Sequence, residues 1–200
     1  MQYEPRSNQL VRALATWSGA LAGMMMILVG GFIPVHILVA TPSLSTKLLV
    51  LPSTWQVPAL LLCSLVCGAR AGVIASSAYL TIGLFHLPIF HDGGSLEYAL
   101  SPGFGFLAGF IPASWLSGML SQQNGMNNIK RLTQASIAGL ILIQACGVFM
   151  LIAGSLFNLW SEQLPQLLIS YSLGPLPTQL ALCISVGILA LPIRRLLFIE

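Results

Sequence analysis

The chain has 200 residues, of which 56% are hydrophobic and only 6% are charged. A soluble domain carries about 25% charged residues, so this composition excludes a soluble fold that covers its surface with polar side chains. The length suits one domain. The net charge of +3 comes without a basic patch interleaved with aromatic residues, which argues against nucleic acid as a partner.

The charged residues divide the chain into six long uncharged runs. Each run has at least 21 residues, and they are 13–46, 48–69, 71–91, 98–129, 132–161 and 163–193. A helix needs about 20 apolar residues to cross the hydrocarbon layer. Inside lipid it also pairs all of its own backbone groups. The sequence therefore predicts an all-α membrane protein, a single integral domain over residues 1–200 with six transmembrane helices. We place these helices near 13–33, 54–69, 71–88, 103–121, 133–155 and 177–195, with a tight turn at 68–72 between the second and third.

The basic residues predict the orientation of these helices. If the N-terminus is cytoplasmic, seven basic residues fall inside and only Lys47 falls outside. The seven are Arg6, Arg12, Arg70, Lys130, Arg131, Arg194 and Arg195. Cytoplasmic loops carry an excess of lysine and arginine, so both termini are expected to be cytoplasmic.

The three outward connections carry the unusual residues. The first, about 34–53, is long but apolar, and we expect an irregular segment that folds back as a lid or lines a cavity. The second, after residue 87, is rich in glycine and proline. In the third, about 156–176, apolar residues at 164, 167, 168 and 171 predict a short helix at the membrane interface, unless the spacing is accidental. The outward side is therefore the expected binding side.

Small residues form a stripe on the first helix at Ala15, Gly19 and Gly23. Such spacing lets another helix approach closely. Two interpretations stay open, which are packing within the chain's own bundle and docking of a partner membrane protein.

Motifs for catalysis are absent from the sequence. There is no phosphate-binding loop, no H-E-x-x-H, no G-x-S-x-G and no C-x-x-C. His86, His91 and Asp92 lie close together in the sequence, but contact with a polar ligand or ordinary loop polarity is favoured over a metal site. The four cysteines lie in predicted helices, which favours packing over disulfides or metal binding. We therefore predict a binding component and not an enzyme, with no cofactor and with any energy supplied by a partner.

Four stretches between residues 52 and 121 resemble a known family. They are 52–56 (PSTWQ), 65–72 (LVCGARAG), 79–90 (YLTIGLFHLPIF) and 102–110 (PGFGFLAGF). In order and spacing they are similar to motifs of BioY, the biotin-binding S component of energy-coupling factor (ECF) vitamin transporters.

The resemblance implies a six-helix S component in the plasma (inner) membrane that captures biotin from outside. It also implies docking, through small residues of the first helix, on an EcfT-like coupling protein driven by two ATPase subunits, which hydrolyse ATP. Together with the residue types, it points to aromatic walls and polar contacts for the ligand. The candidates are Trp55, Phe90 and Phe104 as walls, and Gln56, Tyr79, His91, Asp92 and Gln179 as polar groups.

The last helix departs from the family pattern. Where the family carries L-P-G-D-x-x-K, residues 176–182 read LPTQLAL, so Gln179 replaces the aspartate and Leu182 replaces the lysine. Either the ligand is held differently here, with Lys47 as a possible source of charge, or the ligand is another small vitamin or precursor. A membrane scaffold subunit with no transport role is the alternative from a different class.

Overall fold

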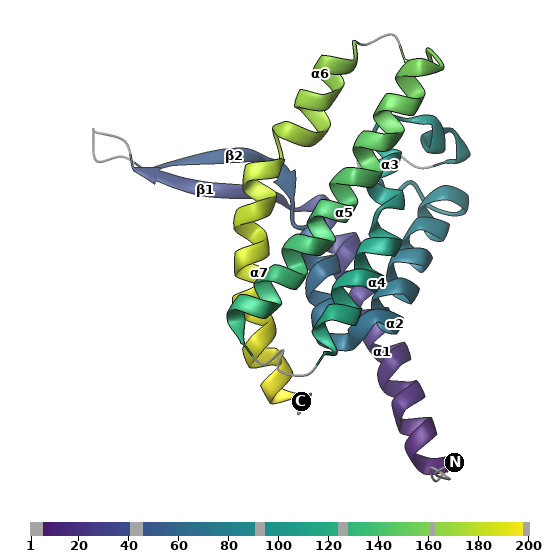
Figure 1. The fold of residues 1–200 in the computed structure, drawn as a ribbon, viewed down its shortest axis with the longest axis vertical. Coiled ribbons are helices and arrows are strands. Elements are labelled where there is room, and N and C mark those ends of the chain that lie inside the picture. Colours follow the sequence, from purple (N-terminus) through teal and green to yellow (C-terminus); the bar gives the residue numbers. More distant parts are fainter. Residues whose placement is uncertain (1–5, 41–45, 91–94, 124–127, 161–162, 198–200) are drawn as a thin grey trace.

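The computed structural model describes residues 6–40, 46–90, 95–123, 128–160 and 163–197. Long helices dominate, and a short two-stranded sheet projects from one end of the bundle (Figure 1). The elements in chain order are α1 (Arg6–Phe32), β1 (Pro34–Ala40), β2 (Thr46–Thr54), α2 (Gln56–Phe85), the 3-10 helix η1 (Leu96–Leu100), α3 (Phe104–Ala108), α4 (Phe110–Ser121), α5 (Ile129–Leu156), α6 (Leu164–Leu168), the π-helix η2 (Ile169–Leu173) and α7 (Leu176–Leu196).

Five helical segments of the described chain are long and apolar enough to cross a membrane: Gln9–Phe32, Gln56–Phe85, Phe104–Ser121, Ile129–Leu156 and Leu164–Leu196. The chain is therefore a mostly helical protein suited to crossing the membrane several times.

α1 begins before the predicted boundary at residue 13. A charged residue ends a lipid-facing segment but does not end a helix, because the backbone hydrogen bonds continue on the aqueous side.

α2 reverses direction at Gly68, which has φ 85° and ψ 175°. A straight helix would separate residues 64 and 72 by about 12 Å. Here a Cβ built on Gly72 would lie only 3.2 Å from Cβ of Ser64. A Cβ on Gly118 of α4 would collide with the backbone of Ala69. The two halves of α2 thus lie against each other, and α4 closes tightly over the reversal.

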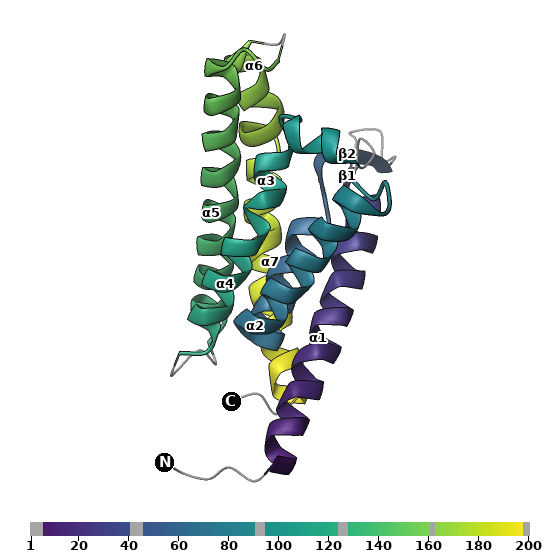
Figure 2. The same cartoon turned by 90° about the vertical axis from the view of Figure 1, so that its right-hand side faces the viewer.

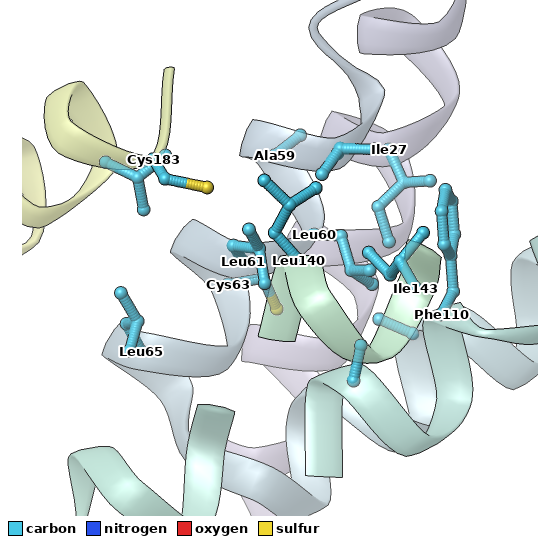
Figure 3. Packing of buried hydrophobic residues seen from close by; sticks show 14 of the residues in the cluster. Ile27, Ala59, Leu60, Leu61, Cys63, Leu65, Phe110, Leu140, Ile143 and Cys183 are labelled. Carbon is cyan, nitrogen blue, oxygen red and sulfur yellow. The ribbon is translucent and has the colours of Figure 1, made fainter. Parts of the chain in front are cut away.

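α2 forms the centre of the bundle and is the most buried of the five segments. Its side chains Leu60, Leu61 and Leu65 are fully enclosed. Figure 3 shows this cluster, where Ile27 of α1, Phe110 of α4, Leu140 and Ile143 of α5, and Cys183 of α7 surround the residues of α2. Small residues in α1 and α4 bring the helices close, so dispersion contacts stabilise a bundle that has few charges.

The first outward connection is an antiparallel β-hairpin, so the prediction of an irregular backbone is wrong, whereas the prediction that this connection lines a cavity is confirmed for β2. Ile37 pairs with Leu49 and Ala40 with Thr46, with a bulge between Pro34 and His36. The ladder pairs backbone groups that an irregular loop would leave exposed to an apolar environment. Branched residues such as Val35 and Ile37 favour this extended backbone.

The two ends of the bundle differ in charge. We call one the basic end, because it holds six of the eight described basic residues, namely Arg12, Arg70, Lys130, Arg131, Arg194 and Arg195. Both chain termini lie on this side, at the bottom of Figures 1 and 2. The other end, which we call the hairpin end, carries β1, β2, η1 and α6 (Figure 2). Six of the seven basic residues that were predicted to be cytoplasmic thus gather at one end of the bundle.

The third outward connection contains a short helix at the predicted position. α6 covers Leu164–Leu168 and continues through η2 toward α7, so it extends the last helix and is not an isolated surface element. Leu167 is fully buried. A π-turn widens the helix locally and is frequent at functional sites. Here it carries Ser170, Tyr171 and Ser172 at the hairpin end.

Candidate functional site: a cavity under the hairpin

A cavity of about 510 Å³ lies at the hairpin end, where β2, α2, η1, α3, α4, α5, η2 and α7 meet. This volume falls within the range of small-molecule pockets, about 300–1,000 Å³. The wall is mostly apolar, with a few polar groups. Its lining residues are Pro34, Val50, Leu51, Pro52, Ser53, Thr54, Gln56, Val57, Tyr98, Gly103, Phe106, Leu107, Phe110, Ile143, Ser170, Tyr171, Pro175 and Gln179.

A chain of hydrogen bonds fixes Gln179 at the edge of this cavity. The Ser172 hydroxyl donates to Oε1 of Gln144 at 2.8 Å. Nε2 of Gln144 then donates to Oε1 of Gln179 at 2.9 Å. Gln144 and Ser172 are buried. Because the amide oxygen of Gln179 is occupied as an acceptor, its NH₂ group remains as the donor that this side chain presents to a ligand.

Gln56 also lines the cavity, and Tyr79 holds its side chain in place. Nε2 of Gln56 donates to Oη of Tyr79 at 2.7 Å, and Tyr79 donates to the carbonyl of Ile89 at 3.4 Å. Tyr79 is only 1% exposed, so it supports Gln56 from behind and does not line the cavity. Among the described residues, the amide oxygen of Gln56 has no hydrogen-bond partner, which leaves an acceptor for a ligand.

Aromatic rings form much of the remaining wall. Phe106 and Tyr171 are stacked, with ring centroids 6.4 Å apart and an angle of 20° between the planes. Tyr98 lies 4.8 Å from Phe90 between centroids, and Phe90 packs edge-on against Tyr79 at 5.5 Å. Phe90 is itself buried over Gly83, where a Cβ would collide with its ring. This arrangement offers flat apolar surfaces to a ligand ring.

The structure brings some predicted site residues to the cavity and leaves others away from it. Gln56 and Gln179 line it. Trp55 does not, because it lines a separate apolar groove with residues of α1 and α7. Phe104 is partly buried against the core, and Phe90 lies behind Tyr98. His91 and Asp92 lie outside the described residues.

Two of the three small residues of the α1 stripe pack against α2 of the same chain. A Cβ on Gly19 would lie 2.9 Å from Cβ of Cys67, and one on Gly23 would collide with Sγ of Cys63. Both glycines therefore admit α2, while Ala15 is exposed. Docking of a partner at Ala15, Gly19 and Gly23 stays a prediction.

Several residues that line or support the cavity were not predicted from the sequence. Gln144, Ser172, Tyr98, Phe106 and Tyr171 were not among the candidates. Gln144 had a detectable signal, since a polar side chain in the middle of a long apolar run is costly in lipid and marks a functional position by default. The aromatic residues had none, because only the fold separates a cavity wall from a packed core.

The described lining contains no lysine or arginine. The described residues also hold no group of three or more His, Cys, Asp or Glu side chains that could bind a metal ion. The described lining thus offers amides, hydroxyls and aromatic surfaces. Lys47 lies in β2, opposite Val39 in the ladder.

Comparison with known proteins connects this geometry to a family. The model of the BioY family matches residues 11–198. A probable biotin transporter BioY from Lysinibacillus sphaericus is 36% identical over 97 residues, which are 48% of this chain and 50% of that protein. An uncharacterized 21.2 kDa protein of Cyanophora paradoxa is 33% identical over 144 residues, 72% of this chain and 74% of the other.

A biotin transporter BioY from Thermotoga maritima is 32% identical over 101 residues, 50% of this chain and 59% of that protein. The chain thus spans between half and three quarters of these relatives. The fold also matches the crystal structure of the S-component for biotin from an ECF-type ABC transporter. That match has a TM-score of 0.71 and 20% identity, and it covers 98% of this chain and 95% of the other. The resemblance seen in the four sequence motifs is confirmed.

Proposed function

The chain belongs to the BioY family, and on that premise we propose that it is the biotin-capturing S component of an ECF-type vitamin transporter. The observation that carries the proposal is the cavity at the hairpin end, in a fold that matches a biotin S-component over nearly its whole length. The cavity has the size and the mixed lining of a small-molecule site.

The lining offers partners for both parts of biotin's ring system. The ureido group has a carbonyl acceptor and two N–H donors. The NH₂ group of Gln179 donates to the carbonyl, and the free amide oxygen of Gln56 accepts from an N–H. The sulfur-containing ring packs against the stacked pair Phe106 and Tyr171. Tyr79 fixes the side chain of Gln56, and Gln144 fixes that of Gln179. Because both side chains are already ordered, little side-chain entropy is lost on binding.

The carboxylate of biotin has no cationic partner in the described lining of the cavity. We place it toward the mouth of the cavity, where water compensates its charge. The side chain of Lys47, the source of charge expected from the sequence, lies outside the described part of the structure. The lack of a cationic partner in the described lining also favours a second candidate, which is another small vitamin or precursor whose polar groups are neutral. A buried anion without a partner costs several kcal/mol, whereas a neutral ligand avoids that cost.

We further propose six membrane-crossing segments with both termini in the cytoplasm. The reversal at Gly68 supports counting α2 as two segments, and the gathering of arginine and lysine at the basic end supports the orientation. The cavity then opens to the outside. On this proposal the chain binds no cofactor, resides in the plasma (inner) membrane, and docks on an EcfT-like coupling protein whose two ATPase subunits hydrolyse ATP.

Binding of labelled biotin to the purified full chain tests the ligand. We expect saturable binding that unlabelled biotin displaces, and a rise in the thermal unfolding midpoint with biotin concentration, because a ligand that binds the folded state stabilises it. If biotin produces neither effect while another vitamin from a panel produces both, the second candidate replaces the first. If no vitamin in the panel does so, the capture role is contradicted.

A further inference from the structure

A second cavity, of about 580 Å³, lies at the basic end, far from the hairpin. It is formed by α1, the reversal of α2, the end of α4 and the end of α7. Its wall is mostly apolar, with a few polar groups. The lining residues are Ala15, Thr16, Ser18, Gly19, Ala22, Val66, Cys67, Gly68, Ser121, Gln122, Arg194 and Leu197.

Arg194 is the only charged side chain among the described residues that line this cavity. It is 3% exposed. Its Nη1 donates to the carbonyl of Leu65 at 2.7 Å, while its Nε is buried with no hydrogen-bond partner. Among the described residues the one acidic side chain, Glu97, belongs to η1 at the hairpin end. Within the described chain, then, no carboxylate neutralises this guanidinium.

A purely structural role explains only part of this arrangement. The reversal at Gly68 frees carbonyl groups at the end of the first half of α2, and a cation there is favourable. The bond from Arg194 to Leu65 meets that need. It leaves Nε–H without a partner, however, and a buried charge inside a membrane protein is costly unless it is paired. The guanidinium therefore retains unused capacity to bind an anion beside an open space.

The surroundings indicate what kind of anion fits. The hydroxyls of Thr16, Ser18 and Ser121 already donate to backbone carbonyls, so Arg194 and the exposed amide of Gln122 remain as donors. Ala15, Ala22 and Val66 add apolar wall. A guanidinium beside apolar helix faces suits an anionic group that carries a hydrocarbon tail, and basic pockets between membrane helices bind lipid headgroups in this way.

We propose that the cavity around Arg194 binds the phosphate group of an anionic phospholipid at the basic end of the bundle. Free inorganic phosphate offers the same chemistry without the tail, so an experiment has to separate the two. The proposal is independent of which vitamin the other cavity takes. It concerns a different end of the molecule, and its test requires no vitamin.

The test compares two adjacent arginines in the purified full chain. Arg194→Gln removes the buried charge, whereas Arg195→Gln removes the same charge from an exposed position. Binding of phosphatidylglycerol is measured by native mass spectrometry, with phosphatidylcholine as the uncharged reference. We expect about a tenfold or greater loss of phosphatidylglycerol binding for Arg194→Gln and less than about a threefold loss for Arg195→Gln. Equal losses would overturn the proposal, because they indicate general attraction to surface charge.

Two further measurements distinguish the remaining explanations. Inorganic phosphate at millimolar concentration should not displace the lipid; if it binds at Arg194 and the lipid does not, the lipid assignment is overturned. Should Arg194→Gln fail to fold, Thr16→Leu fills part of the cavity and keeps every charge. Thr16 is half-buried on α1 and lines the cavity. Weaker phosphatidylglycerol binding by this variant supports the site, and unchanged binding overturns it.

Discussion

The side-chain amides of Gln144 and Gln179 meet at the edge of the hairpin-end cavity, with Nε2 of Gln144 2.9 Å from Oε1 of Gln179. The two residues come from α5 and α7, and Ser172 of η2 holds Gln144 from the other side. Three helical segments thus combine to fix one side-chain amide at the edge of the cavity. Polar side chains are few in this membrane protein, and those of Gln144, Ser172 and Gln179 meet at this point.

The first prediction concerns this network. Gln144→Leu removes the acceptor of Ser172 and the donor to Gln179, so Gln179 loses its fixed orientation. We expect biotin affinity to fall by about two- to tenfold, the range for one net hydrogen bond. Isothermal titration of the detergent-solubilised chain measures it. Gln134→Leu is the control, because Gln134 is exposed on the same helix. A normal affinity for Gln144→Leu would exclude the network from recognition.

The second prediction concerns the contact between Gly83 and Phe90. A Cβ at residue 83 would collide with the Phe90 ring, which packs against Tyr79 and Tyr98. Gly83→Ala should therefore destabilise the fold by about 1–3 kcal/mol and weaken ligand binding as Tyr98 shifts. Gly31→Ala is the matched control, since its Cβ would meet Gln56 at an ordinary 3.7 Å. Thermal unfolding of both variants measures the difference, and equal midpoints would contradict the predicted strain.

The third prediction concerns the reversal of α2. Gly68 has φ 85°, and a Cβ there would also collide with Nε2 of Gln122. Gly68→Ala should cost about 1–3 kcal/mol from backbone strain alone. Adding Gln122→Ala removes the collision but not the strain, so the double variant should recover only part of the lost stability. Full recovery, judged by the unfolding midpoint relative to Gln122→Ala alone, would show that the backbone conformation imposes no cost.

The fourth prediction concerns orientation. In a background without Cys63, Cys67, Cys146 and Cys183, single cysteines are introduced at Ile37 of the hairpin and at Gln123 after α4. Both positions are exposed. A maleimide that cannot cross membranes should label Ile37→Cys in intact cells and Gln123→Cys only after permeabilisation. The reverse pattern would place the hairpin end in the cytoplasm and refute capture from outside.

Sequence reasoning predicted the helical, membrane-spanning character well because charge is costly in lipid, so the uncharged runs are visible without any structure. It also located the reversal near Gly68, since two glycines flank Arg70. It failed at the hairpin. Residues 48–51 are uniformly apolar and show no alternation, so nothing in them distinguishes a strand from a buried loop.

The site was predicted in part for a similar reason. Gln56 and Gln179 stand out as polar residues at helix starts, and both line the cavity. Trp55 is next to Gln56 in sequence, yet it lines a different groove. Neighbouring residues on a helix point in directions about 100° apart, so only the packing of the helices decides which one faces the cavity. The polarity of Gln144 is visible in the sequence, but its place beside Gln179 depends on the packing of α5 against α7.

The reversal at Gly68 has a consequence for how the chain is made. The segment 56–67 gives a helix only about 18 Å long at 1.5 Å per residue. The hydrocarbon layer is about 30 Å thick. This first half is therefore too short to be threaded into lipid on its own during synthesis. We therefore expect the two halves to enter the membrane together, because the contacts with the second half, such as Ser64 against Gly72, supply the helix neighbour that the first half needs.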